Sequence, residues 1–179
     1  MRMAPLAPPV GGPAREPLGW TDFCRRYEAE CLPQSFEPTD IVFTGNDRAT
    51  VFRINAEVNR EIKPKTDIEH WGVVERWDLP SNGFGDCEDY VLLKRKRLAA
   101  AGLPLQALLV TVVTDPAGDG HAVLTVKTDR GDYILDNMHD QVKLWRETPY
   151  GFVKRQSQSD PNAWVSIGRP AEAPMIVSR

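Results

Sequence analysis

Three residues have the types and the order that cysteine acyl transfer requires: Cys87, His121 and Asp136. In such sites a base activates the thiol and a carboxylate orients the base. The glycine-containing loop 81–85 leads into Cys87, and good helix formers follow to about residue 101. We therefore predict that Cys87 stands at a helix N-terminus, where unpaired backbone N–H groups favour the thiolate. The alternative interpretation of a lone cysteine is a small buried hydrophobic residue.

The base and the orienting carboxylate lie on two predicted strands. Residues 121–128 begin with His121 and alternate in polarity, and residues 132–136 end with Asp136. We expect these strands to form a hairpin that brings the two side chains near each other. A simple tight turn would leave them some residues out of alignment, and a bulge or a longer loop would correct that. His139, three residues past Asp136, is the weaker rival for the base.

Three carboxylates surround the cysteine: Asp86, Glu88 and Asp89. Acidic residues in the first turn of a helix complement its dipole, which is one interpretation of this cluster. Like charge beside a thiol disfavours the thiolate, however. A bound hard cation would remove that conflict, so the three residues are also candidate metal ligands.

The elements that must position these residues follow from the pattern of the chain. Residues 20–31, with Thr21 as the expected cap, and a second stretch from Asn46 or Asp47 to residue 62 have helical spacing. The run 67–86 is expected to be mostly irregular. Strands are expected at 105–114, 121–128, 132–136, 152–154 and 164–167. This order predicts an α+β fold, with N-terminal helices and a central nucleophile helix packed on an antiparallel sheet.

Length and composition fit one domain with a substantial core: 179 residues, 41% hydrophobic and 26% charged. The net charge of -3 gives no reason to expect nucleic acid or an anionic membrane surface. No apolar run approaches the roughly 18 residues of a membrane span. We expect a flexible leader at 1–19, the catalytic domain at 20–168 and a loose tail at 169–179. The leader lacks the apolar segment of a signal peptide.

The other two cysteines, Cys24 and Cys31, could pair, which would fit an oxidising compartment. Residues seven apart on a straight helix are about 10 Å apart along its axis. The Cα atoms of a disulfide are about 4.4–6.8 Å apart. A bridge therefore requires the helix to end before Cys31, and Pro33 favours an end near there. Two reduced core cysteines are the open alternative.

Several motifs together resemble those of the bacterial transglutaminase-like cysteine proteinases, over about residues 20–164. The motifs are Trp71-Gly72, Trp77, Gly85-Asp86-Cys87-Glu88-Asp89-Tyr90, His121-Ala122-Val123-Leu124 and Leu135-Asp136-Asn137. The resemblance implies a papain-like or transglutaminase-like arrangement and a cysteine endopeptidase. Cys87 would be the nucleophile, His121 the general base and then acid, and Asp136 the orienting group. The N–H of Cys87 at the helix start is the natural oxyanion donor.

The LapG-type branch of that family implies more. Its members are periplasmic, release a biofilm adhesin, and have calcium associated with residues of the cysteine motif. By position, that role falls on Asp86 and Glu88, with Asp89 as a third candidate. The resemblance thus implies calcium as a cofactor, a protein substrate such as a large surface adhesin, a membrane receptor as regulator and a periplasmic location.

Two other functions remain open. The first is transglutaminase-type acyl transfer to an amine, which needs a channel that admits a lysine and keeps water out. No extra segment of this short chain is expected to build such a channel. The second is a peptide-binding module without catalysis, and the intact cysteine, histidine and aspartate argue against it.

Overall fold

The computed structural model describes residues 4–168 and 177, and within them a seven-stranded antiparallel sheet packs on helices. The strand order is β1-β9-β8-β4-β5-β6-β7. Its strands are β1 (Val10–Ala14), β4 (Leu108–Thr114), β5 (Gly120–Thr128), β6 (Gly131–Leu135), β7 (Lys143–Leu144), β8 (Gly151–Gln156) and β9 (Trp164–Ile167). A separate parallel pair consists of β2 (Lys63–Pro64) and β3 (Phe84–Gly85). The predicted α+β class is confirmed.

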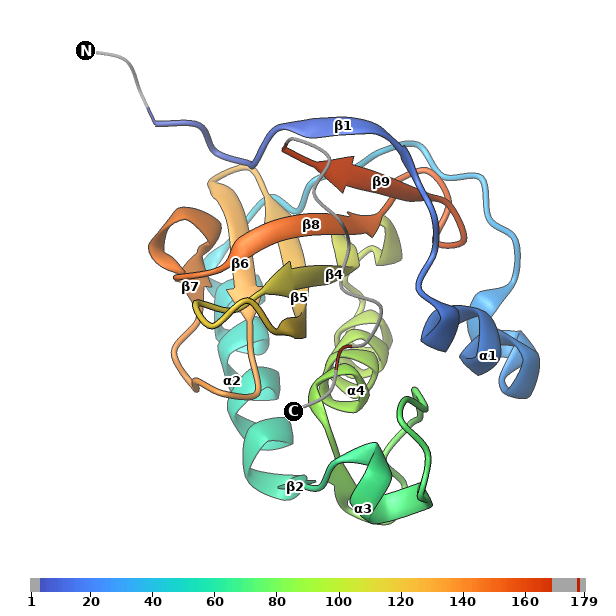
Figure 1. The fold of residues 1–179 in the computed structure, drawn as a ribbon. Coiled ribbons are helices and arrows are strands. Elements are labelled where there is room, and N and C mark those ends of the chain that lie inside the picture. Colours follow the sequence, from blue (N-terminus) through green and yellow to red (C-terminus); the bar gives the residue numbers. More distant parts are fainter. Residues whose placement is uncertain (1–3, 169–176, 178–179) are drawn as a thin grey trace.

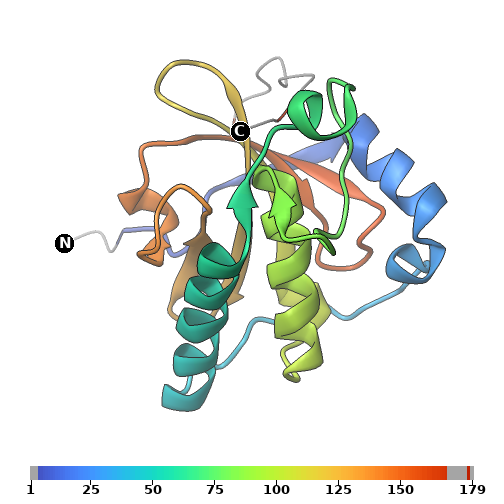
Figure 2. The same ribbon diagram turned by 90° about the horizontal axis from the view of Figure 1, so that it is seen from below.

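The helices lie mainly on one side of this sheet. They are α1 (Leu18–Arg26), α2 (Gly45–Glu61), α3 (Asp67–Trp71) and α4 (Cys87–Ala100), with short 3-10 turns η1 (Glu28–Cys31), η2 (Leu105–Ala107) and η3 (Trp145–Glu147). Helix α4 packs against β4 and β5, and α2 runs beside α4 (Figures 1 and 2). Helix α4, which begins with Cys87, is therefore the central helix, as predicted.

Helix α4 begins and ends where the sequence predicts. Asp86 is the N-cap, and Gly102, just past the helix, has a φ of 96°, which costs little without a side chain. Nine of its fourteen residues are buried, including charged ones, because α2, the sheet and the loop before the helix surround it. Its position in the core gives Cys87 a rigid support.

Helix α2 contributes the stripe that its spacing predicts. Val51, Ile54 and Val58 are buried. Its N-cap is Thr44, whose hydroxyl accepts a hydrogen bond from the Asp47 N–H. The expected cap at Asn46 or Asp47 is thus wrong by two or three residues, because the helix starts earlier than the first polar pair suggests.

Helix α1 ends at Arg26, and the chain then tightens into η1. The break shortens the path between Cys24 and Cys31, whose Cα atoms are 5.5 Å apart and whose sulfurs form a disulfide. The expected helix 20–31 is therefore two elements. Its N-cap is Pro17 and not Thr21.

The termini differ from the predicted boundaries. Strand β1 lies within the predicted leader and pairs with β9, with Ala14 opposite Trp164. Of the predicted tail, only Val177 lies within the described residues, and it is buried with its N–H donating to Glu75. The rest of that prediction, residues 169–176 and 178–179, lies outside them.

The run 67–86 is less irregular than expected. It holds α3, which starts at a capping box formed by Thr66 and Glu69. Trp77 is a core residue, whereas Trp71 is 40% exposed. Among the described residues, no helix has the length and apolar character to cross a membrane.

Candidate active site

Cys87 is the first residue of α4. Its side chain is 0% exposed within the main core cluster, and it is the free cysteine of the chain, since Cys24 and Cys31 are bridged. The first N–H groups of the helix have no carbonyl of a preceding turn to bind. The Cys87 sulfur is therefore closed to solvent in this structure.

His121 of β5 and Asp136, the residue after β6, form a buried pair with Nε2 and Oδ1 2.9 Å apart. The register pairs Leu124 with Leu135, so the next step along both strands brings Asp136 opposite Val123. Asp136 is then two residues out of line with His121 on the same face, a diagonal that long side chains can span. The two residues are thus out of alignment, as expected for a simple tight turn, and the diagonal contact needs neither a bulge nor a longer loop to bring them together.

The Asp136 carboxylate is held from two further directions. Oδ1 accepts the Met138 N–H at 3.0 Å, and Oδ2 accepts a hydrogen bond from the Tyr150 hydroxyl. The Tyr150 ring also packs against the His121 imidazole, with ring centroids 5.4 Å apart. The carboxylate therefore has one orientation, and the imidazole is covered by an aromatic ring on one side.

The electrostatics of the pair favour imidazolium. Burial opposes the charge, but hydrogen bonding and charge from Asp136 and Cys87 outweigh it and raise the pKa of His121 to about 10. Burial also acts to raise the pKa of Asp136, yet its bonds to His121 and Tyr150 hold that pKa below its usual value. Because Nε2 binds Asp136, the ring nitrogen that remains for the thiol is Nδ1, which is buried without another hydrogen-bond partner in the described chain.

A cavity of about 220 Å³ opens beside the imidazole. Its lining residues are Asp115, Pro116, His121, Met138, His139, Pro149 and Tyr150. His139, the rival base from the sequence, is an exposed part of this lining, whereas His121 holds the carboxylate contact. The cavity therefore reaches the His121 side of the buried pair.

An acidic cluster lies next to the cysteine. Carboxylate oxygens of Asp67, Asp86 and Glu88 lie within 4.8 Å of one another, and all three residues are buried. Both oxygens of Asp86 and Oε1 of Glu88 have no hydrogen-bond partner in the described chain. The other Glu88 oxygen accepts the Cys87 thiol at 3.1 Å. Buried carboxylate oxygens without partners are a suitable donor set for a hard cation.

The raised pKa values of this cluster have one main cause. Burial raises the pKa of Asp67 to about 6 and of Asp86 to about 7, and the pKa of Glu88 lies well above its usual value. Neighbouring negative charges add to burial at each residue.

Asp89, the third predicted ligand, has a different environment. Its Oδ1 accepts the Asp78 N–H at 2.7 Å and its Oδ2 accepts the Asp86 N–H at 3.2 Å. Burial and the charge of Asp86 raise its pKa to about 9. Asp89 would have to give up one of these backbone contacts to bind a metal, so the structure brings Asp86 and Glu88 together with Asp67 instead.

Two residues of the site were not predicted. For Asp67 the sequence contained a local signal: the capping box of Thr66 and Glu69 marks a helix start, and Asp67 is the first residue of that helix, α3. Tyr150 had none, since it reaches Asp136 from the segment after η3.

The comparison with protein families gives a match over most of the chain. A family model described as bacterial transglutaminase-like cysteine proteinase matches residues 10–172. No curated protein matches.

Solved structures of Legionella pneumophila LapG have a similar fold. The calcium-bound form has 20% identity and a TM-score of 0.57, covering 70% of this chain and 74% of that one. A second LapG structure has 22% identity and a TM-score of 0.52, with coverages of 60% and 62%. The EGTA-treated form has 18% identity and a TM-score of 0.55, with coverages of 71% and 70%.

Proposed function

Since the chain belongs to the bacterial transglutaminase-like cysteine proteinases, we propose that Cys87, His121 and Asp136 are the residues with which it hydrolyses a peptide bond. The observation that carries this proposal is the buried 2.9 Å contact of His121 with Asp136, beside a cysteine at the start of α4. It is also supported by the raised pKa of His121, to which both Asp136 and Cys87 contribute against the effect of burial.

In the acylation step, the Cys87 proton first passes to His121, whose charged form the site favours, and the sulfur then attacks the substrate carbonyl carbon. The N–H of Cys87 at the helix start donates to the oxyanion that develops. The carbon–nitrogen bond then breaks, and His121 returns the proton to the leaving amine. Asp136 keeps the imidazole oriented and stabilises its charged form throughout.

In the deacylation step, His121 removes a proton from water, and the resulting hydroxide attacks the thioester carbonyl. The carbon–sulfur bond breaks, the acid product leaves, and the thiol is restored with the proton from His121. We propose water as the acceptor because the matching family consists of proteinases, and transfer to an amine would also require a channel that admits a lysine and keeps water out.

The acidic cluster is proposed to bind calcium, as the calcium-bound relative does. Asp86 and Glu88 have the unpartnered oxygens and Asp67 lies within reach of both. The role of Asp89 remains a prediction. A bound calcium ion would supply positive charge that offsets the carboxylates beside Cys87 and so favours the thiolate.

The proposed setting is the periplasm, with a large surface adhesin as substrate in biofilm control and a membrane receptor as regulator. The Cys24–Cys31 disulfide supports an oxidising compartment. The substrate and the regulator rest on the resemblance to the LapG-type branch.

The test is to incubate the full chain with a bacterial surface-protein extract and a labelled primary amine, and to map new protein N-termini. We expect new termini that vanish with Cys87→Ala and His121→Gln. His139→Gln tests the rival base from the sequence, and we expect the new termini to persist in it, because the contact with Asp136 belongs to His121. Amine incorporation without new termini would replace hydrolysis by acyl transfer, and termini that persist in Cys87→Ala would contradict the assigned nucleophile.

A further inference from the structure

The basic run at the centre of α4 contains a lysine that the proposed reaction does not use. Lys96 and Arg97 face outward and pair with Glu30 and Glu61. Lys94, in contrast, is 0% exposed, and its Nζ donates to the backbone carbonyl of Asp136 at 3.1 Å. A buried ammonium group is costly, so this contact calls for a specific explanation.

Helix geometry links Lys94 to the nucleophile. It follows Cys87 by seven residues, which is two helical turns, so both side chains lie on the same face of α4 about 10 Å apart along the axis. Cys87 interacts with His121 at one end of that face, and Lys94 binds the Asp136 backbone at the other. One rigid helix thus contacts both ends of the His121–Asp136 pair.

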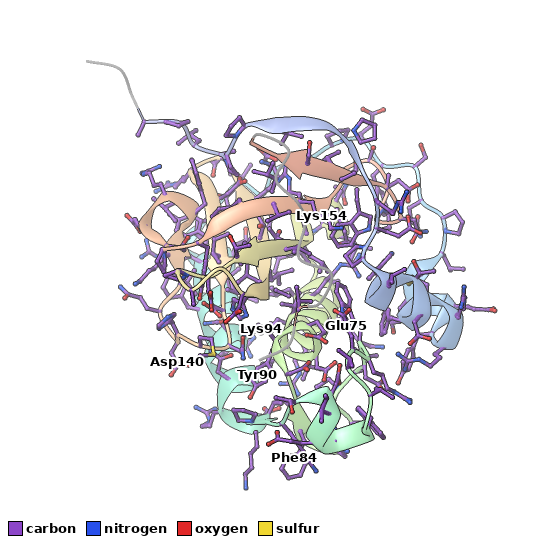
Figure 3. All side chains as sticks on the ribbon, in the orientation of Figure 1. Glu75, Phe84, Tyr90, Lys94, Asp140 and Lys154 are labelled. Carbon is purple, nitrogen blue, oxygen red and sulfur yellow. A yellow bond between two sulfur atoms is a disulfide. The ribbon has the colours of Figure 1, made fainter. Side chains whose placement is uncertain are left out.

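A second helix supports the same carbonyl. Asn59 of α2 donates its Nδ2 to the Asp136 carbonyl at 3.0 Å and to Asp140 Oδ1 at 2.8 Å. Asn55, one turn earlier on α2, donates to the Asp140 carbonyl at 2.9 Å. Lys94, Tyr90 and Asp140 lie in the region beneath the sheet edge in Figure 3. The loop that begins at Asp136 is therefore tied to α4 and α2 at once.

Among the described residues, the Lys94 ammonium group forms no ion pair with a carboxylate, and its hydrogen bond goes to the backbone carbonyl of Asp136. Burial lowers its pKa to about 7, against the attraction of the Asp136 and Asp140 charges. Its Nζ also lies 5.9 Å from the centroid of the Tyr90 ring. An apolar side chain of similar size would fill this site without the free-energy cost of removing a charge from water. We therefore attribute the presence of a lysine here to its hydrogen bond with the Asp136 carbonyl.

We propose that Lys94 is a positioning residue that, together with Asn59, fixes the backbone of Asp136 relative to the nucleophile helix. This rests on the proposed function, in which Asp136 orients His121. By holding the start of the loop, Lys94 sets the distance between the carboxylate and the imidazole that must meet the Cys87 thiol.

The test uses Lys94→Met in the full chain, which keeps length and apolar volume but removes the donor. Lys96→Met is the matched control on the exposed face of the same helix. Small displacements of catalytic groups can cost about 100-fold in rate, so we expect kcat to fall about 10- to 100-fold with KM changed less than about twofold. Lys94→Gln, which retains an N–H donor on a shorter arm, should recover part of the loss.

A second readout does not depend on activity. The proton between His121 and Asp136 should give a downfield resonance in NMR spectra, assigned by its absence in His121→Gln. We expect Lys94→Met to shift or broaden this signal, and Asn59→Ala to do the same, while Lys96→Met leaves it unchanged. The NMR result separates failure of this proposal from failure of the proposed function, because it holds even if the wild-type chain hydrolyses nothing. An unchanged resonance in folded Lys94→Met, or in folded Asn59→Ala if Lys94→Met does not fold, would overturn the positioning role, as would an unchanged kcat in folded Lys94→Met.

Discussion

Asp86→Asn tests the proposed calcium site most directly, because its effect on stability should change sign with calcium. Asp86 is the N-cap residue of α4 and is buried among Asp67 and Glu88. Asparagine is as good an N-cap as aspartate, so the helix start should tolerate the change. What the substitution removes is one negative charge and one of the two carboxylate oxygens of Asp86, because an amide NH2 group takes its place.

The magnitude follows from the geometry. Two full charges at the 4.8 Å limit of this cluster repel by about 3 kcal/mol at an effective dielectric constant of about 20. Partial protonation relieves some of that repulsion, so we expect calcium-free Asp86→Asn to be about 2 kcal/mol more stable than the wild type at pH 8. For a chain of this size, this corresponds to a Tm about 4–8 °C higher.

In calcium, we expect the wild type to be more stable than Asp86→Asn. A ligand at about 100 times its Kd stabilises the wild type by about 2.7 kcal/mol. The variant keeps only one neutral oxygen at this position in place of a charged carboxylate, so calcium should stabilise it little. Thermal unfolding of both proteins, after chelation and again in millimolar calcium, measures the crossover, and calorimetry of the stripped wild type measures the binding itself.

Two further variants identify the third ligand. Asp67→Asn should lose most of the calcium-induced rise in Tm. Asp89→Asn should lower Tm with and without calcium yet keep the rise, since Asp89 holds the N–H groups of Asp78 and Asp86. If Asp89→Asn abolishes the rise and Asp67→Asn keeps it, Asp89 is the ligand and the grouping with Asp67 is refuted. A wild-type Tm that ignores calcium would refute the site altogether.

Three other predictions concern the pair, the buried lysine and the disulfide. Tyr150→Phe removes the hydroxyl that binds Asp136, and a lost hydrogen bond to a charged group is worth about 1.5–3 kcal/mol, so steady-state kinetics should show kcat reduced about 10-fold or more with the fold intact by circular dichroism; an unchanged kcat would remove Tyr150 from the site. Lys94 has a pKa of about 7 in the folded chain, below the ordinary 10.5, so the unfolded state binds more protons between these values and stability should rise with pH across that window. Urea unfolding at pH 7 and pH 9.5 measures this rise, and Lys94→Met should flatten it. Protein exported to the periplasm should have lost both thiols of Cys24 and Cys31 by mass spectrometry; free thiols there would leave the proposed location without its structural support.

The sequence by itself determined the elements whose signals are local. The helix formers after Cys87 and the glycine at 102 place α4, and the spacing of Val51, Ile54 and Val58 gives α2 its buried face. Such signals are periodicity and caps, which depend on residues a few positions apart. The same local signals place Cys87 at the start of a helix and His121 and Asp136 at the ends of two strands.

Tertiary structure decided which of these groups meet. The diagonal contact of His121 with Asp136 depends on the register of β5 and β6, and a register is set by packing along the whole hairpin. Tyr150 and Lys94 bind Asp136 from other parts of the chain. No local pattern encodes such contacts, because each depends on how helices and strands pack.

The acidic cluster shows the same division within one motif. The sequence placed Asp86, Glu88 and Asp89 in one turn, where their types alone make them equivalent. In the folded chain the Asp89 carboxylate accepts hydrogen bonds from backbone N–H groups. Asp67, the first residue of α3 and about 20 residues earlier in the chain, lies with Asp86 and Glu88 instead. The side chain's direction on the helix, and the loop that packs over that face, decide which carboxylates share a site.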